Sequence, residues 1–155
     1  MTIDDWLGQA IDLAVKNVSD QGGPFGAVVV RDGEVIGEGT NRVTATLDPT
    51  AHAEVVAIRD ACRRTGEFAL TGAVLYASCE PCPLCLAASL WARVDHVVFA
   101  ATREDAAAAG FDDARFHRAL TAKPEAWADT LEHRDHPRSG DPFAAWHADA
   151  SRVPY

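Results

Sequence analysis

Apolar side chains near the start of the chain recur at the spacing of an amphipathic helix. Between residues 3 and 19 they follow one another at three- and four-residue intervals, beginning with Ile3 and Leu7. This spacing places them on one face of a helix. Thr2 stands where a side-chain oxygen can cap the first free N–H groups. We therefore predict a helix over residues 3–19.

Two short apolar runs follow, and their separation indicates a hairpin. Residues 27–31 and 34–39 have strand character and come after a glycine-rich loop at 21–26. They are joined by Asp32-Gly33, a pair that readily adopts the positive φ angles of a two-residue hairpin turn. We predict two antiparallel strands connected at this turn.

The middle of the chain alternates between helical and strand-like patterns. Strands are predicted at 73–78 and 96–101, and helices at 50–65 and 83–91. The first of these helices is expected to start at the chain break 48–50. A helix, a hairpin and then this alternation are typical of an α/β domain. We predict a three-layer α/β/α sandwich with a central mixed sheet.

The pattern weakens after Gly110. The alanine run at 106–109 favours helix over linker. Residues 121–142 are rich in charge, proline and glycine and are predicted to be irregular, whereas residues 142–149 are predicted to form a short final helix.

Composition is that of an ordinary globular protein. The chain has 155 residues, of which 48% are hydrophobic and 24% charged, and no apolar stretch approaches the ~18 residues of a membrane span. We expect a single domain over residues 1–155. The N-terminus lacks the basic-then-apolar order of a secretion signal, so we expect a cytoplasmic protein with no membrane partner. A net charge of −9 favours a small neutral partner over nucleic acid.

The most informative chemistry lies in two short segments. Residues 52–54 are His-Ala-Glu, and residues 81–85 are Pro-Cys-Pro-Leu-Cys. His52, Cys82 and Cys85 are residue types that bind zinc. Three protein ligands leave the fourth tetrahedral position open for a water, whose pKa zinc lowers to about 7. This is the arrangement of a catalytic zinc site.

Glu54 is better placed to carry protons than to bind the metal, because a fourth protein ligand would exclude the water. We predict that it takes a proton from the zinc-bound water and delivers it to the substrate. Pro81 and Pro83 mark a helix start, whose partial positive charge would favour thiolates at the two cysteines. Backbone N–H groups near Cys82 would steady the tetrahedral intermediate.

Each half of this pattern also occurs elsewhere. A C-x-x-C segment fits redox and structural zinc sites too. Together, the two halves match H-x-E…P-C-x-x-C, the known signature of zinc-dependent nucleobase deaminases. Cys79 ends a predicted strand and Cys62 lies in a predicted helix, so neither is assigned to the ligand set. Without a secretion signal, we expect reduced thiols.

These residues resemble the cytidine deaminase-like superfamily, and more closely its bacterial guanine deaminase branch. The zinc motif is common to the superfamily. The Ala-Gly-Phe-Asp-Asp segment at 109–113 and the terminal Tyr155 are more specific to the guanine branch. The matching stretches are 23–27, Asn41, 48–54, 78–85, 91–93, 109–113, 142–146 and Tyr155.

The resemblance implies roles in substrate binding. Phe25 would stack on the base, and Asn41 would hydrogen-bond to its edge. Asp113 would accept from amino and ring N–H groups of a guanine-like edge. Trp91 would form part of the pocket wall, and Tyr155 would enter the site of a partner subunit. Each of these residues also has an ordinary alternative in core packing, a turn, a helix cap or a free chain end.

The resemblance further implies a homodimer in which residues 121–155 form a C-terminal lid that crosses to the partner. The chain departs from the branch in this region. Residues 114–117 stand where the branch has an aromatic-rich stretch, and the acidic residue expected before Pro142 has no assured counterpart. The candidates for this second acid are Glu132, Asp135 and Asp141, and the histidines that such a changed lid would bring to the pocket are His117 and His136.

We therefore predict a zinc-dependent aminohydrolase that converts guanine and water to xanthine and ammonia. Another aminated heterocycle stays open as substrate: an aminotriazine such as ammeline, a modified purine, cytosine or a nucleoside. A tRNA adenosine deaminase shares the zinc motif, but the net charge of −9 counts against it. A non-catalytic zinc-binding protein would not need Glu54, Phe25 and Asn41 together.

Overall fold

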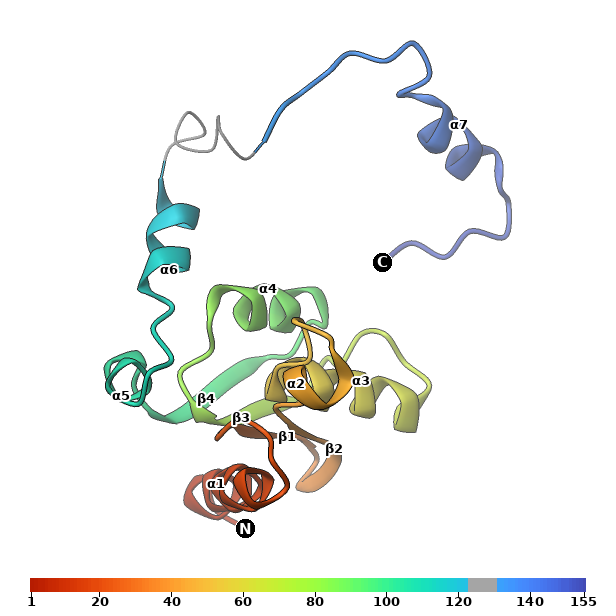
Figure 1. Ribbon diagram of the computed structural model, residues 1–155. Coiled ribbons are helices and arrows are strands. Elements are labelled where there is room, and N and C mark those ends of the chain that lie inside the picture. The colour runs from red at the N-terminus through yellow and green to blue at the C-terminus, as the bar shows by residue number, and fades with distance from the viewer. Residues whose placement is uncertain (123–130) are drawn as a thin grey trace. The chain divides into compact units, whose positions relative to one another are not determined.

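A four-stranded mixed sheet lies at the centre of the first part of the molecule (Figure 1). The computed structural model describes residues 1–122 and 131–155. These fall into two compact units, Met1–Leu120 and Thr121–Tyr155. The sheet belongs entirely to the first unit.

The strands stand in the order β2-β1-β3-β4. The central pairs β1–β2 and β1–β3 are antiparallel, and β3–β4 is parallel, so the sheet is mixed as predicted. The turn between β1 and β2 has φ of 54° at Asp32 and 79° at Gly33, as the predicted hairpin requires. The strands are β1 (Gly26–Arg31), β2 (Glu34–Thr40), β3 (Val74–Cys79) and β4 (His96–Ala101).

Helices cover both faces of this sheet (Figure 1), which confirms the predicted three layers. On one face, helix α1 (Ile3–Ser19) buries Trp6 against Val28 and Tyr76. On the other face, helix α3 (Ala53–Thr65) packs on Val29 and Leu75 and lies beside α4 (Pro83–Trp91). Alternate strand residues therefore serve two separate cores, as the two-residue period of a strand requires.

Helix α3 rests directly on the backbone of β2. A Cβ atom added at Gly39 would meet the carbonyl oxygen of Ala53 and the amide nitrogen of Ala57. Gly37 makes a similar approach further along the helix, where a Cβ would come within 2.5 Å of the Ala57 carbonyl oxygen. Only glycine allows this contact. The close packing fixes the start of α3, which carries His52.

The sequence placed most elements within a residue or two, but α3 begins later than predicted. The side chain of Asp48 accepts hydrogen bonds from the backbone N–H and the hydroxyl of Thr50, at 2.8 and 2.7 Å. This local turn competes with the helix, so the helix starts only at Ala53. The alanine run is helical as expected, within α5 (Arg103–Ala108).

Two helices were not predicted: α2 (Val43–Thr46) and α6 (Ala114–Thr121). Both are short and follow segments without a clear apolar period. None of the helices in residues 1–122 and 131–155 combines the length and apolar character needed to cross a membrane.

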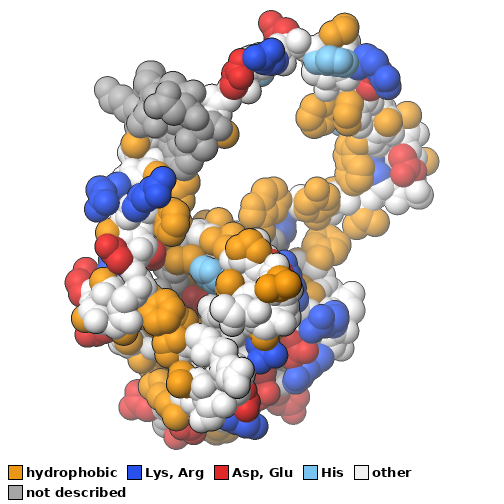
Figure 2. All heavy atoms as spheres, viewed as in Figure 1, with side chains coloured by type: hydrophobic (Ala, Val, Ile, Leu, Met, Phe, Trp, Pro, Cys, Tyr) orange, Lys and Arg blue, Asp and Glu red, His pale blue; other side chains and the backbone are white. Residues whose placement is uncertain are grey.

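The second unit contains α7 (Asp141–Ala148), within one residue of the predicted final helix. Every residue described in this unit is exposed, including Phe143, Trp146 and Tyr155. Figure 2 shows hydrophobic side chains open on the surface around α7. The predicted irregular stretch 121–142 includes residues 123–130, which lie outside the described residues.

Candidate active site

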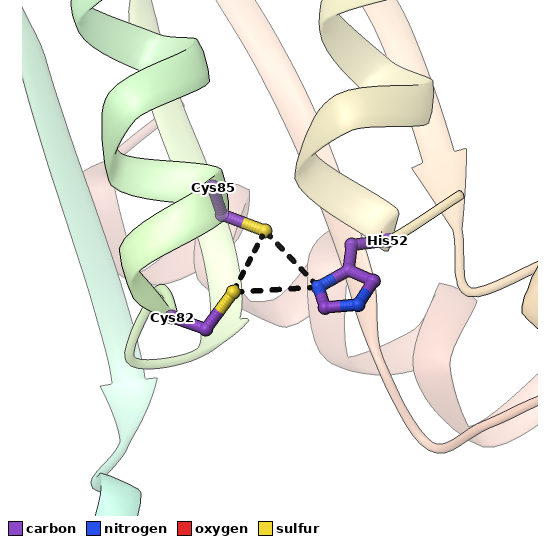
Figure 3. Close-up of side chains that lie close together, drawn as sticks. All are labelled: His52, Cys82 and Cys85. Carbon is purple, nitrogen blue, oxygen red and sulfur yellow. Dashed lines mark hydrogen bonds between the residues drawn. The ribbon is translucent and has the colours of Figure 1, made fainter. Parts of the chain in front are cut away.

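Three side chains from two helix starts converge on one point (Figure 3). His52 Nδ1 lies 3.4 Å from Cys82 Sγ and 3.3 Å from Cys85 Sγ, and the two sulfurs are 3.5 Å apart. Within the described residues, this is the group of ligand-type side chains close enough to hold a metal ion.

The spacing of these three atoms suits zinc. With Zn–S of about 2.3 Å and Zn–N of about 2.0 Å, tetrahedral angles separate the ligand atoms by about 3.5–3.8 Å. The distances of 3.3–3.5 Å are only slightly shorter. One nitrogen and two sulfurs are also the donors that zinc prefers, and three ligands leave one position open.

The local fold explains how these side chains come together. His52 is the N-cap residue of α3, and Cys82 is the N-cap residue of α4, with Pro83 in its first turn. Cys85 lies one turn along α4 and is fully buried. The two helices pack against each other on one face of the sheet. Both zinc segments therefore stand at helix starts.

Hydrogen bonds within this group shift the pKa values of the two thiols in opposite directions. The Cys85 thiol donates to Cys82 Sγ and lowers the pKa of Cys82 to about 4, with a further contribution from His52. The same hydrogen bond, together with burial, raises the pKa of Cys85 far above its usual range. The pKa of His52 is raised by its hydrogen bond to Cys82. One thiolate thus forms easily, and a bound metal would displace the proton of the second thiol.

Glu54 lies in the first turn of α3, two residues after His52, and its side chain is buried with an exposed fraction of 8%. Burial raises the pKa of this carboxyl, because a low-dielectric surrounding disfavours the charged form. A carboxyl with a raised pKa holds a proton more readily than an exposed carboxyl does. It lies beside the metal ligands without belonging to the ligand group.

A cavity of about 290 Å³ opens directly above these residues, within the first unit. Its wall combines the metal group with aromatic and polar side chains. That volume lies at the small end of the range for ligand pockets, about 300–1,000 Å³, and suits one small flat molecule. Its lining residues include Phe25, Asn41, His52, Glu54, Cys82, Phe111, Asp113 and Phe116.

Comparison with known proteins identifies the family. The model of the cytidine and deoxycytidylate deaminase zinc-binding region matches residues 1–101. The chain belongs to this family. Its predicted family, fold class and zinc cofactor are thereby confirmed, and with them its assignment as a zinc-dependent hydrolase of the nucleobase deaminase type.

Two individual likenesses extend over the whole chain. The guanine deaminase of Bacillus subtilis is 44% identical over 156 residues, which is 100% of each chain. The crystal structure of guanine deaminase from that organism matches with a TM-score of 0.95, covering 100% of this chain and 99% of the other. A relative of another kind, the tRNA-specific adenosine deaminase of Haemophilus influenzae, is 37% identical, and the match covers 72% of this chain and 68% of the relative.

Two of the residues expected to bind substrate have structural partners as well as a place in the cavity wall. Asn41 Oδ1 accepts from the N–H of Val43 at 3.3 Å, so the side chain also forms a turn. Phe25 packs against the core and meets Phe111 edge-on, with ring centroids 5.0 Å apart. At both positions the side chain can therefore serve the fold and also contact a substrate. Substrate binding by these two residues stays a prediction.

Asp113 also lines the cavity, whereas the last two predicted substrate residues are not among the lining residues. Trp91 ends α4, is 64% exposed and is absent from the lining of this cavity. Tyr155 belongs to the second unit and is 74% exposed. Their predicted roles stay predictions. The candidates for a second acid, Glu132, Asp135 and Asp141, lie in the second unit as well, as does His136.

Sequence reasoning missed an ion pair in the cavity wall. Glu80 accepts from the Arg103 backbone N–H at 3.0 Å and lies 3.0 Å from its guanidinium. Glu80 follows β3, and Arg103 comes two residues after β4. Because these strands are parallel, their carboxyl ends meet at one edge of the sheet. That rule was the available signal for finding this pair.

Proposed function

We propose that this protein deaminates free guanine to xanthine, with release of ammonia. The observation that carries the proposal is the full-length likeness to a guanine deaminase, which includes the C-terminal unit. The likeness to a tRNA-specific adenosine deaminase spans less of the chain. The net charge of −9 also disfavours a polyanionic partner.

The cavity wall favours a guanine edge over other bases. Asp113 offers a carboxylate, which accepts hydrogen bonds but does not donate them. Guanine carries an N–H on the ring nitrogen beside its exocyclic amine, so both groups can donate to one carboxylate. Adenine and cytosine have a lone pair at the corresponding ring nitrogen and would face the carboxylate less favourably. Phe25 provides an aromatic face for a flat ring.

The roles of the residues around the metal follow from their chemistry. His52, Cys82 and Cys85 would hold zinc, which supplies a nucleophilic water at neutral pH. Glu54 would accept a proton from that water and pass it to a ring nitrogen and then to the departing amine. Its burial keeps the carboxyl away from bulk solvent, so a proton that it accepts is delivered within the cavity.

We also propose that the C-terminal segment, residues 121–155, acts as a lid in a homodimer and brings Tyr155 to the neighbouring site. Support comes from the exposure of every described residue of this segment, including Phe143 and Trp146. Closing such a segment over the cavity would exclude water and strengthen the electrostatic interactions inside it. The cytoplasmic location stays a prediction.

The test is an ammonia-release screen with the purified zinc-loaded protein. Guanine, adenine, cytosine, ammeline and guanosine are compared by kcat/KM, and tRNA is examined for inosine. E54Q serves as a background control for contaminating activity. We expect guanine to be the best substrate, with xanthine as product. A higher kcat/KM for any other compound, or inosine formation in tRNA, would replace this proposal.

A further inference from the structure

Asp113 has a partner that the catalytic scheme does not use. His117 Nε2 lies 2.9 Å from Asp113 Oδ2. The two residues are four positions apart, one turn of helix at the start of α6. Their side chains are only 26% and 22% exposed. Because a carboxylate only accepts, the proton in this hydrogen bond belongs to Nε2.

The hydrogen bond reaches Asp113 without placing the imidazole in the cavity wall. Asp113 lines the cavity, as does Phe116, whereas His117 is absent from the lining residues. Among the described residues, Oδ1 of Asp113 has no hydrogen-bond partner. One carboxylate oxygen is therefore held by the protein, and the other is available to a ligand.

The backbone before Asp113 is held at two points. Phe111 packs edge-on against Phe25, with an interplanar angle of 88°. Asp112 accepts a hydrogen bond from the N–H of Ala114 at 2.9 Å through its side chain. These contacts fix the main chain but not the rotation of the Asp113 side chain. The hydrogen bond from His117 supplies that last restraint.

We propose that His117 is a positioning residue for substrate recognition, which holds the Asp113 carboxylate so that Oδ1 faces the N–H edge of guanine. The inference rests on the proposed function. Holding the carboxylate in advance spares the entropy of ordering it when the base binds. The ring N–H of guanine keeps its contact with Oδ1 in the bound base and in the transition state alike, so loss of the restraint raises KM and leaves kcat nearly unchanged.

The simpler alternative is a hydrogen bond that only stabilises the first turn of α6, as pairs four residues apart commonly do. In that case its removal lowers the unfolding temperature and leaves KM unchanged. Kinetic and stability measurements on the same variants therefore separate the two roles.

The experiment compares three variants of the full-length zinc-loaded enzyme with guanine as substrate. H117L removes the donor, and H117Q keeps an amide N–H at nearly the reach of Nε2. R115A is the matched control, since Arg115 is an exposed residue of the same helix outside the cavity wall. We expect KM to rise about 10-fold in H117L, the range of a hydrogen bond to a charged group. H117Q and R115A should stay within about 3-fold of wild type, and kcat should change little in all three.

A double-mutant cycle with D113N completes the test. D113N alone should raise KM by about 100-fold, because it loses the anionic acceptor. If His117 acts through Asp113, D113N/H117L should match D113N within about 3-fold. Additive effects in the cycle would overturn the proposal. So would a KM for H117L equal to that of R115A, or failure of H117Q to restore KM at normal zinc content and unfolding temperature.

These outcomes are distinct from failure of the proposed function. If the wild-type protein and R115A release no ammonia from guanine, the guanine assignment is wrong and the inference about His117 falls with it. If both are fully active and H117L behaves as they do, only the role of His117 is wrong. Should H117L fold poorly, H117A takes its place in the same KM comparison and in the double-mutant cycle.

Discussion

The two units of this chain differ in whether their apolar side chains are buried or exposed. Met1–Leu120 buries them in two clusters, one on each face of the sheet. In Thr121–Tyr155 every described residue is exposed, including Phe143, Trp146 and Tyr155. A short segment cannot bury much surface against itself, because small units have a high ratio of surface to volume. The aromatic side chains of the second unit therefore stay exposed within the single chain.

The candidate functional residues are distributed just as unequally between the two units. Every residue that lines the cavity, and every member of the metal group, belongs to the first unit. Variants of the metal group, of Glu54 or of the closely packed core in the first unit should thus remove activity or destabilise the fold. Variants of the second unit should change activity only through closure of the site, and should leave folding and metal binding intact.

The largest effect is expected at the metal ligands. C85S should lose both zinc and turnover, because a hydroxyl is a poor replacement for a buried thiolate ligand. C62A is the control, since Cys62 lies on α3 outside the ligand group. Metal analysis should give about one zinc per chain in wild type and C62A. A C85S protein that keeps a full equivalent of zinc would remove Cys85 from the site.

Next comes Glu54. E54Q should keep zinc and fold but lower kcat by roughly 10²–10⁴-fold, since an amide cannot accept the proton of the water. E67Q is a suitable control, because Glu67 is exposed, lies two residues beyond the end of α3 and is outside the cavity wall. Turnover and zinc content are measured on the same samples. An E54Q rate within a few-fold of wild type would mean that another group carries the proton.

Truncating the C-terminal segment is expected to have a smaller effect, confined to activity. Deleting Val153–Tyr155 should lower kcat/KM by about 10- to 100-fold, the equivalent of about 1.4–3 kcal/mol of transition-state stabilisation. Zinc content and the unfolding temperature should stay close to wild type, because these residues are exposed.

Mixing this truncated protein with E54Q tests exchange of the lid between subunits. A mixed dimer would contain one site with both Glu54 and a complete tail. After subunit exchange at equal amounts, activity should recover to about a quarter of wild type. Full activity of the truncated protein would disprove the lid, and absence of recovery would disprove its action across the dimer.

The smallest expected effects are changes in the free energy of unfolding. They are compared for one glycine variant in each unit. G39A should destabilise the fold by about 1–3 kcal/mol, because a Cβ there meets the backbone of α3. G140A should stay within about 0.5 kcal/mol of wild type, since a Cβ at Gly140 meets nothing within 4 Å. Denaturant unfolding measures both. Equal free energies of unfolding for the two variants would mean that α3 does not rest on β2 as described.

Features with a local cause could be predicted from the sequence. Thr2 caps α1 and exchanges hydrogen bonds with Asp5, and both residues lie within one turn. The Asp32-Gly33 turn follows from the backbone preferences of two neighbours. The zinc ligand set was predictable for the same reason, since ligand chemistry is a property of residue type and Cys82 and Cys85 lie one turn apart.

Local competition also explains the errors. The start of α3 was placed too early because the side chain of Asp48 holds Thr50 in a turn. Helix α6 was missed because it has only 8 residues, too few to show a repeated apolar spacing. Its first turn is held by the side chain of Asp112 and by the Asp113–His117 hydrogen bond.

The sequence alone indicated most of the elements, the candidate zinc ligands and the carboxylate predicted to carry protons, because each follows from neighbouring residues or from side-chain chemistry. Only the tertiary structure decided which distant residues meet. The approach of His52 to Cys82 depends on α3 and α4 packing side by side on one face of the sheet. The Glu80–Arg103 pair depends on the parallel register of β3 and β4. The placement of Asp113 in the cavity wall depends on contacts such as that between Phe25 and Phe111. Such contacts arise from packing between residues far apart in the chain, which no local pattern records.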